Sequence, residues 1–334
     1  MMARRATGKT RMARALWYVQ KGRVELRAAP LPPPAAGEAR VRSLFSGISR
    51  GTERLVLDGA IGPSEWERMR APMQEGAFPF PVKYGYAATG IVEAGPANLL
   101  GRQVFALHPH QDFFNAPLQA LAPIPESVPA RRATLAANME TALNAIWDGG
   151  AGPGDRIVIV GAGVLGLLLA SLAARLPGAI VTAVDAEESR RALAEGLGIG
   201  FAKPEHAPPD ADIVFHASAT GPGLNTAIRC AGLEAPIVEL SWYGDRAASV
   251  ELGAAFHSRR LRILCSQVGQ IAPSRRPRWS FKRRLEAALG LLTVPALDAL
   301  VAEEMAFETA ARGLPKALAS TAAGLAPVIR YPEA

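Results

Sequence analysis

The feature that most constrains the fold of this chain is a glycine-rich turn between an apolar strand and an apolar helix. Residues 161–166 read Gly-Ala-Gly-Val-Leu-Gly. The apolar pattern around the turn alternates, with strands expected at 156–160, 179–184, 212–217, 237–240 and 261–265 and helices at 164–175, 187–196 and 224–231. Such alternation predicts a parallel sheet covered on both faces, which places this region in the α/β class.

Each glycine of the turn has a separate physical purpose. Gly161 permits the tight turn, Gly163 lets a pyrophosphate approach the backbone, and Gly166 lets the helix pack closely on the strand. The free N–H groups and partial positive charge of the helix N-terminus favour phosphate. An acid, Asp185, ends the next strand 19 residues after Gly166. We therefore expect a dinucleotide site. The alternative is a glycine turn in an α/β domain that binds no nucleotide.

The acid and two arginines bear on which dinucleotide would bind. Asp185 is expected to accept hydrogen bonds from the adenosine ribose, which favours NAD because a 2′-phosphate would be repelled there. Arg190 and Arg191 follow closely and would receive that phosphate if the loop folds back. NADP therefore stays open as the alternative.

The remainder of the chain is organised differently. Residues 13–130 read as a β-rich region, with short segments such as 39–44, 89–93 and 103–107 separated by Gly and Pro. Residues 131–147 have helical spacing. The chain has 334 residues. Because a single core stops growing at roughly 250–300 residues, we expect two domains.

Composition excludes several classes of protein. Apolar residues make up 49% and charged residues 20%, as in ordinary globular chains. The longest apolar run, 157–176, is interrupted by three glycines, so no membrane span is expected. Cys230 and Cys265 are the two cysteines, and neither has metal-ligand spacing. We expect no disulfide framework and a cytoplasmic protein with reduced thiols.

Basic residues give the chain a formal charge of +7. Four of them lie in residues 1–11, which we expect to be a disordered arm unless Met12 is the true start. Nine more lie between 259 and 284, where Trp279 and Phe281 interleave. They suit recognition of an anionic substrate or cofactor phosphate, or form a solvated basic surface. No zinc-finger spacing or RNA-binding motif supports nucleic-acid binding.

Two segments of the β-rich region resemble a known family. Residues 46–53 (Ser-Gly-Ile-Ser-Arg-Gly-Thr-Glu) resemble the segment that carries the first zinc ligand in zinc-type alcohol dehydrogenases. Residues 83–90 resemble their Gly-His-Glu segment, and 212–221 and 239–244 resemble later turns beside the nicotinamide. The whole order resembles the medium-chain dehydrogenase/reductase superfamily. Residues 46–53 are also similar to its bacteriochlorophyllide dehydrogenase branch.

The resemblance implies a domain plan and a set of cofactor contacts. It implies a GroES-like β-rich catalytic domain at 12–135 and 272–334 and a Rossmann domain at 136–271, with the substrate between them. It also implies a homodimer formed through the edge of the Rossmann sheet. Besides the three glycines, the candidate cofactor-binding residues are Val164, Leu165, Asp185, Arg190, Thr141, Ala217 and Trp242.

The zinc ligands of the family are replaced in this chain. Ser49 stands at the cysteine position, Tyr86 at the histidine position and Ala87 at the neighbouring acid. The third ligand position falls near residues 137–140, and residues 109–117 lack the cysteines of the structural zinc lobe. Neutral serine and tyrosine hydroxyls are poor zinc ligands. We expect neither zinc site.

Without a metal, side chains must manage the proton that accompanies hydride transfer. Tyr86 is the first candidate, although it could instead fill the space of the lost histidine. Ser49 and Thr52 suit a hydroxyl relay or a turn that uses them for backbone hydrogen bonds. Glu53 would orient that loop. Glu140 is either a general acid or a helix-surface acid.

Three histidines have open assignments. His108 and His110 flank Pro109 and suit a metal pair, a substrate cleft or neither, since no third ligand is evident. His216 ends an expected Rossmann strand, near the cofactor, and could equally be a buried, satisfied histidine.

The sequence thus predicts a zinc-independent oxidoreductase that transfers hydride between NAD(P) and a carbonyl or alcohol of a small molecule. The first alternative is a quinone or enone reductase that uses NADPH. The second is a catalytically inactive nucleotide-binding protein. Residues 57–82 contain large apolar side chains that suit an apolar or bulky ligand or a core.

Overall fold

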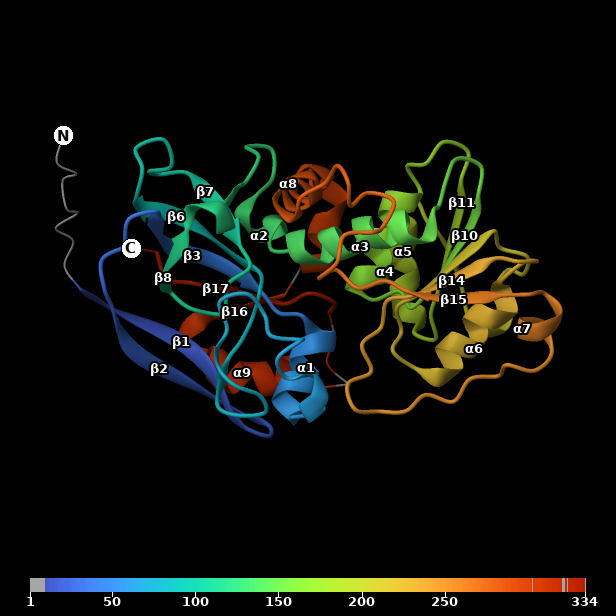
Figure 1. Ribbon diagram of the computed structural model, residues 1–334, viewed down its shortest axis with the longest axis horizontal. Coiled ribbons are helices and arrows are strands. Elements are labelled where there is room, and N and C mark those ends of the chain that lie inside the picture. Colours follow the sequence, from blue (N-terminus) through green and yellow to red (C-terminus); the bar gives the residue numbers. More distant parts are fainter. Residues whose placement is uncertain (1–9, 302, 320–321, 323, 334) are drawn as a thin grey trace. The chain divides into compact units, whose positions relative to one another are not determined.

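The computed structural model describes residues 10–301, 303–319, 322 and 324–333. The chain folds into two compact units (Figure 1): the first runs to Ala137 and resumes at Val301, and the second is Asn138–Leu300. The second unit therefore extends beyond the predicted boundary at residue 272. The physical reason is that α8 (Phe281–Leu291) buries Arg284 against Glu140 within that unit. Residues 1–9 of the expected arm lie outside the described residues, whereas Arg11 already pairs with Leu31.

The first unit is built from two sheets. One has the order β2-β1-β5-β4, and the other the order β16-β17-β3-β6-β7-β9 with β8 also paired to β3. Val41, Val92, Val104 and Phe114 are buried in the core of the second sheet. The strands are β1 (Arg11–Gln20), β2 (Arg23–Leu31), β3 (Glu38–Gly47), β4 (Glu75–Gly76), β5 (Val82–Lys83), β6 (Ala88–Ala94), β7 (Gln103–Ala106), β8 (Phe113–Pro117), β9 (Ala122–Pro123), β16 (Glu304–Ala306) and β17 (Val328–Arg330).

Short helices complete the first unit. They are α1 (Arg50–Asp58), η1 (Pro63–Glu65), η2 (Leu118–Ala120), α2 (Ala130–Ala133) and α9 (Phe307–Ala317). The helical spacing over 131–147 corresponds to two helices, because α2 ends at Ala133 and α3 (Ala136–Gly149) begins anew. The Thr134 hydroxyl donates to the carbonyl of Arg131 at 2.6 Å, a local bond that competes with helix continuation.

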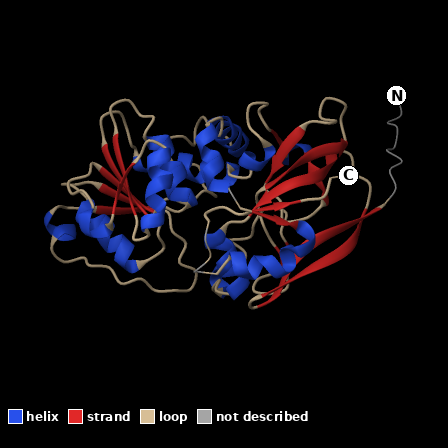
Figure 2. Ribbon diagram, turned by 180° about the vertical axis from the view of Figure 1, so that it is seen from behind, coloured by secondary structure: helices blue, strands red, loops and turns tan. Residues whose placement is uncertain are grey.

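The second unit is the predicted parallel sheet with helices on both faces (Figure 2). Its strand order is β12-β11-β10-β13-β14-β15, and every neighbouring pair is parallel. Val158, Val184, Val214 and Ile237 are among its fully buried side chains, as expected for strands covered on both faces. The strands are β10 (Arg156–Val160), β11 (Ile180–Val184), β12 (Gly200–Ala202), β13 (Ile213–His216), β14 (Pro236–Glu239) and β15 (Arg262–Cys265).

The remaining helices of the second unit are α4 (Val164–Ala173), η3 (Glu188–Arg190), α5 (Arg191–Gly196), η4 (Pro204–His206), α6 (Gly221–Cys230), α7 (Ala255–Ser258) and η5 (Pro295–Val301). The α/β class, with a Rossmann-type sheet in one unit and a β-rich other unit, is confirmed. Within the described part of the chain, the helices are too short or too polar to cross a bilayer.

Candidate functional site

The glycine turn after β10 has the geometry that its sequence predicts. A Cβ atom at Gly161, whose φ is +107°, would lie 2.8 Å from the backbone of Ala217 and Ser218. A Cβ at Gly166 would lie 1.8 Å from the carbonyl oxygen of Gly161, so only glycine lets α4 pack this closely. At Gly163, which caps α4, a Cβ would meet nothing within 4 Å. Two glycines are therefore required by packing, and the third leaves open space at a helix N-terminus, where a phosphate fits.

Asp185 lies directly after β11 and is held by backbone donors. Its Oδ2 accepts from the N–H of Ala162 at 2.7 Å, and its Oδ1 accepts from the N–H of Glu187 at 2.9 Å. A carboxylate has about four acceptor positions, so both oxygens retain capacity for ribose hydroxyls. The first bond also ties the acid to the glycine turn.

The other cofactor candidates surround this turn or lie elsewhere in the second unit. Val164 and Leu165 open α4 and are half-buried, while Ala217 directly follows β13 and packs against Gly161. Trp242 lies half-buried in the loop after β14, and Thr141 lies on α3.

The two arginines after Asp185 differ in what they contact. The Arg191 side chain pairs with Glu188 and Glu195 and stacks over Phe201. Arg190, at the end of η3, forms no side-chain hydrogen bond or ion pair with any residue that the structure describes. Of the two, Arg190 is the one with a guanidinium available to a phosphate.

In the first unit, the structure brings together the three hydroxyl groups proposed to manage the proton. The Tyr86 hydroxyl hydrogen-bonds with the side chains of Ser49 and Thr52. Burial raises the pKa of Tyr86 to about 12, although the two hydrogen bonds oppose this shift. Ser49 precedes α1 as its N-cap but makes no side-chain cap, so its hydroxyl is not used by the helix backbone. The phenol thus stays protonated at neutral pH and can donate a hydrogen bond.

Glu53 anchors the loop that contains Ser49 through hydrogen bonds. Its Oε1 accepts from the Ser49 N–H at 2.8 Å, and its Oε2 accepts from the Tyr18 hydroxyl at 2.7 Å. The Nε2 of His110 lies 3.0 Å from the same Oε2, and neither Glu53 nor His110 is exposed. A buried carboxylate needs such partners, because an unpaired one would be very costly. Glu53 therefore fixes the position of Ser49.

The network continues to the C-terminal strand region. The Nδ1 of His110 lies 2.7 Å from the Ser46 hydroxyl, which lies 3.0 Å from the hydroxyl of Tyr331. Sequence reasoning missed Tyr18, Ser46 and Tyr331. No local pattern could have revealed them, since Ser46 and Tyr331 are 285 residues apart.

The residues at the expected zinc position do not fit a zinc ion. Ser49 and Tyr86 offer neutral hydroxyl groups, which are poor zinc ligands, and His110 is engaged by Glu53 and Ser46. Among residues 10–301, 303–319, 322 and 324–333, no three His, Cys, Asp or Glu side chains gather closely enough to hold a metal.

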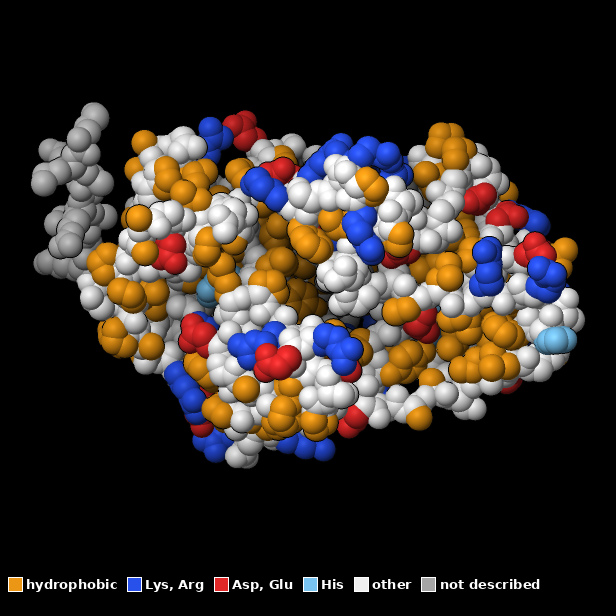
Figure 3. All heavy atoms as spheres, in the orientation of Figure 1, with side chains coloured by type: hydrophobic (Ala, Val, Ile, Leu, Met, Phe, Trp, Pro, Cys, Tyr) orange, Lys and Arg blue, Asp and Glu red, His pale blue; other side chains and the backbone are white. Residues whose placement is uncertain are grey.

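Glu140 is not the helix-surface acid considered from sequence. It is 4% exposed on α3, and its Oε1 accepts from the Arg284 Nε at 2.9 Å. Burial raises the pKa of Glu140, while Arg284 opposes the rise. Arg284 also donates to Asn144 at 2.6 Å, so this end of the basic run is a buried structural element. Exposed Lys and Arg side chains gather over α8 instead, as Figure 3 shows, and Arg278, Lys282 and Arg283 are exposed.

His108 is a core histidine. Its ring stacks on Phe114 with centroids 3.8 Å apart, and it is 4% exposed. Burial, with a contribution from Lys83, lowers the pKa of His108 to about 3, so the ring is neutral.

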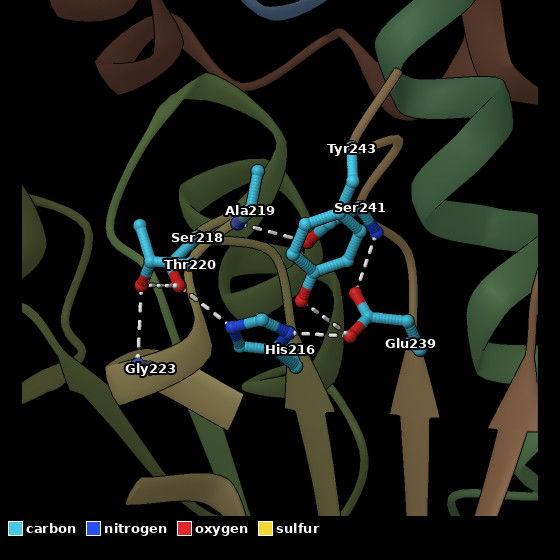
Figure 4. Close-up of polar contacts among 8 residues, drawn as sticks. All are labelled: His216, Ser218, Ala219, Thr220, Gly223, Glu239, Ser241 and Tyr243. Atoms are coloured by element: carbon cyan, nitrogen blue, oxygen red, sulfur yellow. Dashed lines mark hydrogen bonds and ion pairs between the residues drawn. The ribbon is translucent and has the colours of Figure 1, made fainter. Parts of the chain in front are cut away.

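A second polar cluster lies at the carboxyl ends of β13 and β14 (Figure 4). His216 is fully buried, with its Nδ1 2.7 Å from Glu239 and its Nε2 2.6 Å from the Ser218 hydroxyl. His216 is the buried, satisfied histidine expected as one alternative from the sequence, whereas its partner Glu239 was not predicted. The available signal was that both residues end neighbouring parallel strands.

No family model matches the chain. A protein of Haemophilus influenzae (strain ATCC 51907 / DSM 11121 / KW20 / Rd), described as an uncharacterized zinc-type alcohol dehydrogenase-like protein, is 30% identical over 144 residues. The match covers 40% of this chain and 42% of that protein, less than half of either.

Solved structures match over nearly the whole length. A putative zinc-binding dehydrogenase from Sinorhizobium meliloti 1021, bound to NADP, has a TM-score of 0.75 at 18% identity and covers 96% of this chain and 99% of its own. A protein described as a short chain alcohol dehydrogenase from E. coli CFT073, complexed with NADH, has a TM-score of 0.75 at 15% identity, with coverage of 96% and 99%. The chain therefore shares its fold with these solved structures.

Proposed function

We propose that this chain is an NAD(P)-dependent oxidoreductase that transfers hydride between a nicotinamide cofactor and a carbonyl or alcohol without zinc. The observation that carries the proposal is the glycine turn, in which Gly161 and Gly166 exclude any side chain and Gly163 leaves open space. The partial match to a zinc-type alcohol dehydrogenase-like protein and the likeness to structures bound to NADP and NADH support it.

The second unit supplies the cofactor contacts. The turn and the N-terminus of α4 would receive the pyrophosphate, and Val164 and Leu165 line this end of the helix. Asp185 would accept from the adenosine ribose, which favours NAD. Arg190 is the residue that would favour NADP. When bound, the nicotinamide supplies or accepts the hydride.

The first unit supplies the proton. Tyr86 donates a hydrogen bond to the substrate oxygen and stabilises the negative charge that develops on it. An alkoxide is a stronger base than a phenolate, so the phenol proton moves to the product despite a pKa of about 12. Ser49 and Thr52, both half-buried, return a proton to Tyr86 from solvent. Glu53 holds the Ser49 backbone in place for this relay.

The direct test of zinc independence is elemental analysis of the purified protein combined with turnover of NADH or NADPH on a panel of carbonyl compounds. We expect turnover with far less than one zinc per chain and no loss after chelation. About one zinc per chain, with activity lost on chelation, would refute the metal-free mechanism. Absence of turnover on every substrate, with cofactor binding intact, would favour an inactive nucleotide-binding protein.

We further propose a homodimer formed through β15, the strand that ends the six-stranded sheet. Ile263 and Leu264 of this strand are 38% and 36% exposed, and an exposed apolar edge strand is a template for pairing. Leu264→Asp should shift the mass in sedimentation velocity from dimer to monomer. Leu233→Asp, at a position that is 74% exposed but outside the strand, is the matched control and should remain dimeric.

We also propose a cytoplasmic location, because two cysteines cannot form the disulfide framework of a disulfide-rich secreted protein. Cys230 is buried, which raises its pKa to about 11, and Cys265 is exposed. Subcellular fractionation of the producing cell tests this proposal, and recovery outside the cytoplasm would contradict it.

A further inference from the structure

The polar cluster of the second unit forms one continuous chain of hydrogen bonds (Figure 4). It runs from Thr220 to the Ser218 hydroxyl at 3.0 Å, from Ser218 to the Nε2 of His216 at 2.6 Å, and from the Nδ1 of His216 to Glu239 at 2.7 Å. Tyr243 donates its hydroxyl to the same Glu239 oxygen at 3.1 Å. His216 and Glu239 are register partners at the ends of neighbouring strands, which explains why they meet.

The charge state of Glu239 determines which groups donate in this series of hydrogen bonds. Burial tends to raise the pKa of Glu239, but hydrogen bonds from His216 and Ser241 outweigh it and hold the pKa below its usual value. The ionised carboxylate can only accept. The Nδ1–H of His216 therefore donates to Glu239, and the Nε2 of the same ring hydrogen-bonds with the Ser218 hydroxyl.

The cluster connects two loops. Loop 217–220 follows β13, and loop 240–243 follows β14. Besides the chain through His216, the Ala219 N–H donates to the Ser241 hydroxyl at 3.0 Å, and the Ser241 N–H donates to Glu239 at 2.7 Å. Ala219 has a φ of +54°, which a non-glycine residue adopts only when its surroundings impose it. The hydrogen bonds provide that constraint.

These loops lie at the position in the sheet where a dinucleotide is expected. On one side of β10 the sheet continues with β11 and β12, and on the other side it continues with β13, β14 and β15. In open α/β sheets, ligands bind outside the carboxyl ends of the strands at such a switch point. Asp185 follows β11 and serves the adenosine half. We therefore expect the loops after β13 and β14 to bind the other mononucleotide half.

Loop 217–220 also contacts the glycine turn directly. A Cβ at Gly161 would lie 2.8 Å from the carbonyl carbon of Ala217 and 2.8 Å from the nitrogen of Ser218. A displacement of this loop would therefore also displace the backbone of the nucleotide turn. His216 itself is fully buried and cannot touch a ligand, so it would act through the loops that it holds.

We propose that His216, paired with Glu239 and Ser218, is a positioning residue that fixes loops 217–220 and 240–243 for the nicotinamide mononucleotide half of the bound cofactor. This inference rests on the proposed function, since it presumes a dinucleotide at the switch point. It assigns a role to three residues outside the glycine motif. It predicts that substituting them weakens binding of the nicotinamide half of the cofactor and leaves binding of the adenosine half unchanged.

The test measures the dissociation constants of NADH and of ADP by isothermal titration calorimetry. ADP contains the adenosine and the pyrophosphate but lacks the nicotinamide half. His216→Phe keeps an aromatic ring and removes both hydrogen bonds. We expect it to weaken NADH binding about tenfold, the effect of roughly 1.4 kcal/mol, while ADP binding changes less than about twofold.

Further variants keep the test interpretable. Should His216→Phe fail to fold, Ser218→Ala removes one hydroxyl and is expected to weaken NADH roughly threefold with ADP unchanged. His216→Asn, which can still donate to Glu239, should recover part of the loss. Asp185→Ala should weaken both ligands. The matched control is Thr226→Val, a buried α6 residue whose hydroxyl donates to the Pro222 carbonyl and accepts from Arg229, and both affinities should stay unchanged.

Two outcomes would overturn different claims. If the unaltered protein fails to bind NADH, the proposed function itself is refuted. If the unaltered protein binds NADH but His216→Phe or Ser218→Ala leaves its affinity intact, or weakens NADH and ADP equally, only the positioning role is refuted and the cluster is a structural element.

Discussion

The two units each bury a carboxylate that accepts three hydrogen bonds, yet the two carboxylates differ in their surroundings. Glu53 in the first unit is 0% exposed and is covered by Tyr18, His110 and the Ser49 backbone. The Glu239 side chain is 13% exposed and lies at the open carboxyl edge of a sheet. Burial depth should decide what each one does. The deeper network is expected to contribute mainly to stability, and the shallower one mainly to ligand binding.

The largest effect is expected for Glu53→Ala. The substitution leaves Tyr18 and His110 without their partner in the core, and breaking such a buried network costs about 3–5 kcal/mol. Urea unfolding followed by circular dichroism measures the loss. Glu65→Ala removes an acid of the 3₁₀ helix η1 that pairs with the exposed Arg68, and it should change the free energy of unfolding by less than about 0.5 kcal/mol. A loss under about 1 kcal/mol at Glu53 would contradict the stabilising role.

Tyr86→Phe separates catalysis from stability within the first unit. It removes the hydroxyl bonded to Ser49 and Thr52, and we expect kcat to fall about 100-fold with cofactor affinity unchanged. Tyr84→Phe is the matched control, a neighbouring buried tyrosine outside the hydroxyl cluster, and should keep kcat within about threefold. Retention of activity within the same range by Tyr86→Phe would show that this tyrosine only fills space.

Glu239→Ala tests the contribution of the shallower network to stability. Of the three donors that it leaves behind, Ser241 and Tyr243 are half-buried and can bond to water, and only His216 is fully buried. We therefore expect a loss of roughly 1.5 kcal/mol in unfolding free energy, well below that of Glu53→Ala. The same urea titration measures it. Equal losses at both sites would mean that burial depth does not distinguish the two networks.

The acid stability of the first unit should depend on His108. Because the folded-state pKa of His108 is lowered to about 3, its contribution is present above its ordinary pKa of about 6.5 and is lost as the pH falls toward 3. His108→Phe, which keeps the stacking on Phe114, should flatten the decline in the urea midpoint between about pH 6.5 and 4.5. An unchanged slope would mean that His108 is not a buried neutral ring.

What the sequence could predict follows from the range of the interactions. The strand at 156–160 and the glycine turn were predicted residue for residue, because periodicity and turn chemistry act over neighbouring positions. The hydroxyl cluster of Tyr86, Ser49 and Thr52 was anticipated only through the family resemblance. The partners of Glu53 were not, since Tyr18 is 35 residues away and depends on how the strands assemble. Glu140 and Arg284, 144 residues apart, were misjudged for the same reason.

A paired fluorescence titration of the purified protein with NADH and NADPH tests whether the glycine turn binds a dinucleotide. We expect micromolar binding, with NADH about tenfold tighter because Asp185 would accept hydrogen bonds from the adenosine ribose. Tighter NADPH binding would instead indicate that Arg190 binds the 2′-phosphate and determines the cofactor preference. If neither nucleotide binds, the glycine turn is only a packing device, and the oxidoreductase function is contradicted.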